Sequence, residues 1–125
     1  MAHPDPTVKE IGRDDLIHRM HEGERFIIVD VLSHDHFERA HLPGAINVPV
    51  LMLRELAPIL FTDQDEIVVY CANFQCTAST TAAKILMQMG LTDVLDYKGG
   101  ILDWLDGNLP IIRGEEHHHE FRESA

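Results

Sequence analysis

The chain has 125 residues, a single-domain length, and its 45% apolar and 25% charged residues exclude global disorder. Its 21 acidic residues against 10 basic ones give a formal net charge of −11, which argues against binding to nucleic acid or to an anionic membrane surface. No apolar stretch approaches the roughly 18 residues of a membrane span, and the N-terminus lacks the pattern of a secretory signal. We therefore expect a cytoplasmic protein whose two cysteines are reduced.

Strands and helices are expected to alternate along the first half of the chain. Apolar runs predict strands at residues 8–11, 26–29 and 45–48. Apolar spacing and capping residues predict helices at residues 13–21, 33–39 and 51–57. The second strand is apolar throughout and is closed by Asp30, which is typical of a strand buried on both faces. Pro58 is expected to disturb the end of the third helix.

The same alternation continues in the second half. A β-branched and aromatic run within residues 66–71 predicts a central strand, and residues 94–97 predict the last strand. A helix is predicted near residues 79–89, and Gly99-Gly100 is predicted to turn into a short helix that carries Trp104. Alternating strands and helices imply an α/β fold with a mostly parallel sheet and helices on both faces.

Cys71 ends the most strand-like run of the chain, and a loop of residues 72–78 separates it from the next predicted helix. Ligands of open α/β sheets bind outside the carboxyl ends of the strands. Loop N–H groups and the helix N-terminus are expected to face the thiol, which would lower its pKa and favour the reactive thiolate. Two interpretations follow: Cys71 is a nucleophile, or it is a small buried hydrophobic residue.

Three segments, taken in order, are similar to the motifs of one known family. The first joins residues 29–31 (VDV) to residues 41–49 (HLPGAINVP). The second joins residues 69–71 (VYC) to the pair Ala82-Ala83, and the third is residues 97–104 (YKGGILDW). Together they span roughly residues 8–112, and the chain resembles a single-domain rhodanese, or sulfurtransferase-like, protein.

The resemblance implies a rhodanese-like, five-stranded, mainly parallel sheet with helices on both faces. It covers a domain at residues 8–112, and composition predicts a flexible N-terminus (1–7) before it and a charged, His-containing tail (113–125) after it. It further implies that Cys71 takes a sulfane sulfur from thiosulfate, a polysulfide or a persulfide, holds it as a persulfide, and passes it to a thiol or protein acceptor. No cofactor or metal is expected. The substrate-binding residues would be those of the loop after Cys71, namely Ala72, Asn73, Phe74, Gln75, Cys76 and Thr77.

The loop departs from the common form of this family. Phe74 stands where a Gly is usual, Cys76 stands where an Arg is frequent, and the loop is two residues longer, as in a subgroup that carries a second Cys. Loss of the Arg removes a bidentate partner for thiosulfate, so that donor is expected to be used poorly. Asp30 and His34 are expected to support the site, although the alternative for His34 is a solvated surface histidine.

Cys76 has two interpretations. As a second thiol it would attack a Cys71 persulfide, release sulfide and close a disulfide. Alternatively it packs under the loop as a small hydrophobic residue. The altered loop also keeps open a second function, a regulatory module for protein interaction or for sulfide or redox sensing. A phosphatase or arsenate reductase is disfavoured, because the loop has no Arg to close around an oxyanion.

Overall fold

The computed structural model describes residues 7–114. The segment expected to be flexible (1–7) and the charged tail (113–125) therefore lie almost wholly outside the described residues. The strands are β1 (Lys9–Glu10), β2 (Ile27–Asp30), β3 (Ile46–Asn47), β4 (Ile67–Tyr70) and β5 (Val94–Tyr97). The helices are α1 (Arg13–His21), α2 (His34–Arg39), the 3₁₀ turn η1 (Val50–Met52), α3 (Leu53–Leu60), α4 (Ala78–Gln88) and α5 (Gly100–Asp106).

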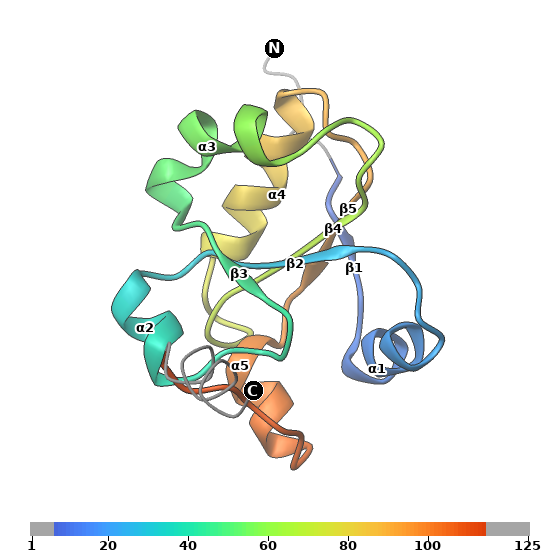
Figure 1. Ribbon diagram of the computed structural model, residues 1–125, viewed down its shortest axis with the longest axis vertical. Helices are drawn as coiled ribbons and strands as arrows, with labels where there is room; N and C mark the ends of the chain where they lie inside the picture. The colour runs from blue at the N-terminus through green and yellow to red at the C-terminus, as the bar shows by residue number, and fades with distance from the viewer. Residues whose placement is uncertain (1–6, 115–125) are drawn as a thin grey trace, which may run out of the picture.

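The five strands form one sheet in the order β1-β5-β4-β2-β3, and every pairing is parallel (Figure 1). This arrangement confirms the predicted α/β class and the five-stranded sheet. β4 is the central strand, and its register aligns Asp30 of β2 with Tyr70 and Tyr70 with Tyr97 of β5. Because all strands run the same way, their carboxyl ends meet at one edge, where ligands of open parallel sheets bind.

Helices cover both faces of the sheet (Figure 1). On one face, residues such as Val29 and Val69 pack with α3 and α4 in a cluster that includes Cys71. On the other, Val68 and Tyr70 pack with Leu16 of α1 and with α5. Side chains alternate along β4, so Cys71 and Tyr70 point to opposite faces. This alternation places Cys71 on the side of the sheet where α4 begins.

The third helix differs from its predicted range of 51–57. Leu51 lies in the 3₁₀ turn η1, and α3 continues through Pro58 to Leu60. A proline inside a helix removes one backbone hydrogen bond. Here the amphipathic helix persists because Leu53 and Ala57 are fully buried against the core, and the backbone N–H of Phe61 still donates to the Ala57 carbonyl at 2.9 Å.

The other helix boundaries lie close to their predictions. α1 has the predicted bounds, and α2 follows Ser33, whose hydroxyl accepts a hydrogen bond from the His36 N–H and so caps the helix. Within the described residues, none of the helices is both long and apolar enough to span a membrane.

Candidate active site at the Cys71 loop

Cys71 directly follows β4 at the carboxyl edge of the sheet, as predicted, and its residue surface is 1% exposed. The first turn of α5 holds the backbone at this point. The Ile101 N–H donates to the Cys71 carbonyl at 3.0 Å, and the Leu102 N–H donates to the Ala72 carbonyl at 2.9 Å. Cys71 and the start of the loop are therefore fixed by an element from the end of the chain.

Gly100 makes this close approach achievable. Its φ of +63° lies in the left-handed region, and a Cβ atom at this position would lie 2.3 Å from the Cys71 carbonyl oxygen. No side chain fits at that distance, so the first turn of α5 requires glycine to reach the Cys71 backbone.

Several bonds anchor α5 itself. The Tyr97 hydroxyl donates to Asp103 Oδ2 at 2.6 Å, and Arg13 Nη1 donates to the Asp103 carbonyl at 2.8 Å. Burial, together with the bond to Asp103, raises the pKa of Tyr97, so its hydroxyl stays protonated and keeps donating. The indole N–H of Trp104 donates to the Pro110 carbonyl at 2.7 Å. α5 is thus a rigid support for Cys71.

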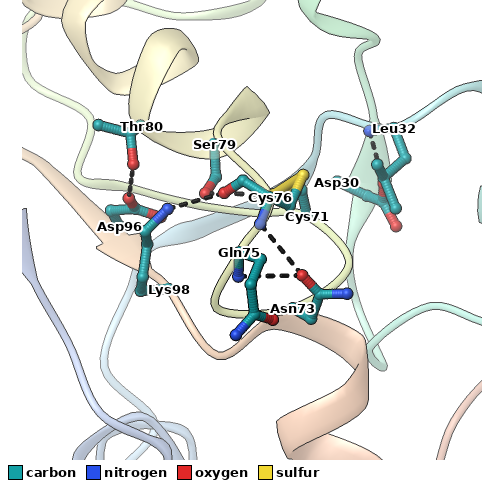
Figure 2. Close-up of a disulfide and its surroundings, with 10 residues drawn as sticks. All are labelled: Asp30, Leu32, Cys71, Asn73, Gln75, Cys76, Ser79, Thr80, Asp96 and Lys98. Atoms are coloured by element: carbon teal, nitrogen blue, oxygen red, sulfur yellow. Dashed lines mark hydrogen bonds between the residues drawn. A yellow bond between two sulfur atoms is a disulfide. The ribbon is translucent and has the colours of Figure 1, made fainter.

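The loop brings the two cysteines of the chain together as a Cys71–Cys76 disulfide (Figure 2). Their Cα atoms are 6.4 Å apart, within the range that disulfides use. The sequence predicts two reduced thiols, whereas the structure pairs them. The physical reason is local: the seven-residue connection between β4 and α4 folds back on itself, so that residues five apart lie side by side.

Asn73 and Lys98 shape that fold. Asn73 Oδ1 accepts hydrogen bonds from the backbone N–H groups of Gln75 and Cys76, both at 3.0 Å, and Lys98 Nζ donates to the Cys76 carbonyl at 2.7 Å (Figure 2). The sequence predicts that loop N–H groups face an anion at the thiol. Those of Gln75 and Cys76 are instead occupied by Asn73, because a short polar side chain in a turn bonds the backbone two residues further on.

The N-terminus of α4 begins next to the disulfide. The hydroxyl of Ser79, a fully buried residue, lies 3.4 Å from the Cys71 sulfur. Its neighbour Thr80 donates from Oγ1 to Asp96 Oδ2 at 2.8 Å, which ties the first turn of α4 to β5. Helix N–H groups and the Lys98 ammonium place positive potential at the loop, and positive potential favours a thiolate once the disulfide is reduced.

Asp30 is buried at the carboxyl end of β2, where Oδ1 accepts a hydrogen bond from the Leu32 N–H at 2.9 Å. Burial raises its pKa, and the Leu32 N–H, Tyr70 and His36 oppose that rise. Because Asp30 is in register with Tyr70, its side chain lies on the face of the sheet opposite to that of Cys71. Asp30 therefore shapes the strand end beside the loop without facing the sulfur.

His34 and Thr77 lie at the margins of the site. His34 is the first residue of α2, and its Nε2 is 3.5 Å from Glu38 Oε2 on the same helix; it does not line the two clefts beside the loop. Thr77 is exposed at the start of α4, and its side chain makes no capping bond. His34 thus belongs to α2 and lies apart from the two clefts beside the loop, and Thr77 marks the point where the loop ends and α4 begins.

Phe74 projects from the loop and is 59% exposed. It lines two open clefts. One, of about 130 Å³, is bordered by Gly12, Lys98 and Gly99. The other, of about 240 Å³, is lined by Asn73, Phe74, Gln75, Gly99, Leu102, Asp103 and Asp106. A molecule that approaches the loop through the larger cleft meets an apolar surface with two carboxylates.

The roles of Lys98 and Ser79 at the loop were not predicted from the sequence, and Gly100 was expected only to form a turn before the last helix. The motif YKGG could have pointed to Lys98 and Gly100, because both residues follow closely after the last predicted strand. In a parallel sheet, residues that follow neighbouring strands meet at one edge, so Lys98 supplies a cation to a loop that lacks an arginine.

Comparison with known proteins gives a consistent assignment. The profile of the family described as Rhodanese-like domain matches residues 13–106. A sulfurtransferase from Allochromatium vinosum is 30% identical over 108 residues, which make up 86% of this chain and 98% of that protein. The HTH-type transcriptional regulator Rv0324 from Mycobacterium tuberculosis is 35% identical over 104 residues, which cover 83% of this chain but only 45% of the regulator.

Solved structures of similar fold support the same family assignment. The crystal structure of the BH2092 protein from Bacillus halodurans superposes with a TM-score of 0.78 at 28% identity, covering 84% of this chain and 77% of that one. The solution structure of the rhodanese-like domain of the Alr3790 protein from Anabaena gives a TM-score of 0.77 at 25% identity, with coverages of 88% and 83%. The chain therefore belongs to the rhodanese-like family, whose members similar to it include a sulfurtransferase of nearly the same extent.

Proposed function

We propose that this protein is a sulfurtransferase that carries sulfane sulfur as a persulfide on Cys71 and passes it to a thiol or protein acceptor. The observation that carries the proposal is the position of the Cys71 sulfur at the carboxyl edge of the sheet, beside the N-terminus of α4, in a rhodanese-like domain. A sulfur in this position is a ready nucleophile when it is reduced.

The proposed reaction has two displacements. The Cys71 thiolate attacks the outer sulfur of a donor persulfide, the sulfur–sulfur bond of the donor breaks, and the donor leaves as its thiolate. An acceptor thiolate then attacks the outer sulfur of the Cys71 persulfide, and Cys71 leaves as the thiolate. The α4 N-terminus and Lys98 favour the anionic sulfur in both steps, since both add positive potential at the loop.

The surroundings favour a persulfide or polysulfide over thiosulfate as the donor. Phe74 gives the loop an apolar face, and the cleft beside it contains Asp103 and Asp106. Two carboxylates repel a dianion, and there is no loop arginine to bind it bidentately. An organic persulfide carries at most one charge on its reacting sulfurs, and a polysulfide spreads its charge along a polarisable chain, whereas thiosulfate concentrates two charges on one small group. The persulfide and the polysulfide therefore suit this cleft better.

The disulfide must be reduced before Cys71 reacts, so a thiol reductant is part of the proposed cycle. This requirement supports a cytoplasmic location, where thiols are kept reduced. The proposed partners are small molecules and proteins. The net charge of −11 argues against nucleic acid and membrane surfaces as partners. No cofactor is needed for the two displacements.

The test is a turnover assay with glutathione persulfide as donor and a small thiol as acceptor, on protein reduced beforehand. We expect sulfur transfer by wild type and by Cys76→Ser, and no transfer by Cys71→Ser. Both variants replace one cysteine sulfur of the same loop with an oxygen. Cys76→Ser therefore controls for the general effect of this replacement on the loop. Unchanged turnover in a folded Cys71→Ser protein would contradict the proposal.

A second candidate is a redox-sensing module. Two observations favour it: the disulfide that occupies both cysteines, and the 35% identity to part of a protein named as a transcriptional regulator. This candidate predicts reversible oxidation of Cys71 and Cys76 without multiple turnovers. The same assay separates the two, because a sensor would accept at most one sulfur per chain.

A further inference from the structure

We infer that Cys76 is the resolving thiol of this site, so that the domain acts as a persulfide reductase and releases hydrogen sulfide. This inference rests on the proposed loading of sulfur onto Cys71 and adds a fate for that sulfur. The observation behind it is the Cys71–Cys76 disulfide, which is the product that such a reaction would leave.

The backbone at both cysteines is held in place. α5 fixes Cys71 through its carbonyl, with the Ile101 N–H at 3.0 Å. Cys76 is fixed by Asn73, whose backbone carbonyl and Oδ1 both accept from the Cys76 N–H, and by the ammonium of Lys98 on its carbonyl. With a Cα–Cα separation of 6.4 Å, the two sulfurs meet without a large rearrangement of the loop.

Burial favours this internal partner over an external one. Cys71 is 1% exposed, so an external thiol must displace part of the loop to reach its sulfur. Cys76 already lies beside it, and closing a connection of five residues costs little chain entropy. A reacting group that is held in place has a high effective concentration, so Cys76 competes well against thiols in solution.

The chemistry balances with one reductant. The Cys76 thiolate attacks the inner sulfur of the persulfide, the Cys71 Sγ atom. The bond from Sγ to the outer sulfur breaks, and the outer sulfur leaves with the electron pair and its proton as hydrosulfide. The sulfane sulfur is reduced and the two cysteines are oxidised to the disulfide. A dithiol reductant then supplies two electrons and two protons, restores both thiols, and becomes a disulfide itself.

Lys98 is a positioning residue in this scheme, since its bond to the Cys76 carbonyl at 2.7 Å holds the resolving residue toward Cys71. Loss of a charged hydrogen bond of this kind corresponds to about a tenfold effect on a step that needs the held geometry. Lys98→Met should therefore slow sulfide release about tenfold after loading. Lys98→Arg keeps a cationic donor and should restore most of the rate.

The experiment uses full-length protein that is reduced, freed of reductant under anaerobic conditions, and given one equivalent of glutathione persulfide. Sulfide is measured over time, and the state of each cysteine is read by alkylation and peptide mass. Wild type should release one sulfide per chain and end as the Cys71–Cys76 disulfide. Cys76→Ser should keep one added sulfur on Cys71 and release sulfide more slowly, by about tenfold or more.

Two failures are distinguishable. If wild type and Cys76→Ser hold the added sulfur equally long, Cys76 does not resolve the persulfide, and sulfur transfer by Cys71 stands alone. If Cys76→Ser gains no sulfur on Cys71, the proposed sulfurtransferase function itself fails. Equal sulfide release by loaded Lys98→Met and wild type would overturn the positioning role of Lys98.

Discussion

Replacement of Gly100 by alanine tests whether α5 positions Cys71. The added Cβ would lie 2.3 Å from the Cys71 carbonyl oxygen and 2.9 Å from the Ala72 carbonyl carbon. Both are backbone atoms, so they cannot rotate away as a flexible side chain would. The first turn of α5 must withdraw, and the hydrogen bonds that it makes to Cys71 and Ala72 lengthen or break.

The cost has two parts. A non-glycine residue in the left-handed region costs about 1–2 kcal/mol. Loss of the two hydrogen bonds from α5 adds about 0.5–1.5 kcal/mol each. Alanine also restricts the unfolded chain, which offsets about 0.4–1 kcal/mol of this destabilisation. Gly100→Ala should therefore lower the free energy of unfolding by about 1–5 kcal/mol, and it should also slow sulfur loading because Cys71 is displaced.

Gly23→Ala is the matched control. Gly23 has a similar φ of +69°, but a Cβ there would meet nothing within 4 Å, so only the conformational cost applies. The assay is urea unfolding under reducing conditions, followed by the fluorescence of Trp104, the single tryptophan, which is buried on α5. Equal destabilisation by the two substitutions, with normal sulfur loading in Gly100→Ala, would refute the reasoning.

Three further predictions concern the site and its surroundings. Cys71→Ser should abolish sulfur transfer while the circular dichroism spectrum stays native, because a serine hydroxyl keeps the shape but is not ionised at neutral pH; retained turnover would exclude Cys71 as the nucleophile. The kcat/KM for thiosulfate should be lower than that for glutathione persulfide at matched ionic strength, and an equal or higher value would contradict the role given to the apolar, acidic cleft. Burial raises the pKa of Asp30, so the folded protein holds a proton on this carboxyl that the unfolded chain has already lost. The free energy of unfolding of wild type should therefore fall relative to that of Asp30→Asn as pH rises from about 4 toward 7. A difference that does not change with pH would contradict the raised pKa.

The fold was largely accessible from the sequence. Short-range patterns were enough to predict most of the elements. The apolar run at 26–29 and the β-branched run before Cys71 form neighbouring strands of the sheet, and the helix at Arg13–His21 has its predicted bounds. The helix at Leu53–Leu60 extends past its predicted end, because the burial of Leu53 and Ala57, which depends on the rest of the fold, outweighs the local effect of Pro58.

The candidate site was accessible only in part. Cys71 could be placed because it follows a strand directly. The pairing with Cys76 was one of two interpretations that the sequence left open. It depends on how Asn73 turns the loop and on Lys98, which is distant in sequence and reaches the loop only in the folded sheet. Likewise, Asp30 precedes the site in the chain, but only the register of β2 with β4 shows that its side chain lies on the opposite face.

The central claim is that Cys71 carries the transferred sulfur, and peptide mass spectrometry tests it most directly. Reduced Cys76→Ser protein is incubated with one equivalent of glutathione persulfide, alkylated and digested, and the peptide that contains Cys71 is examined. The account predicts that this peptide gains one sulfur, and that a thiol acceptor then removes it. A Cys71 peptide that gains no sulfur, or a sulfur that no acceptor removes, would contradict the account.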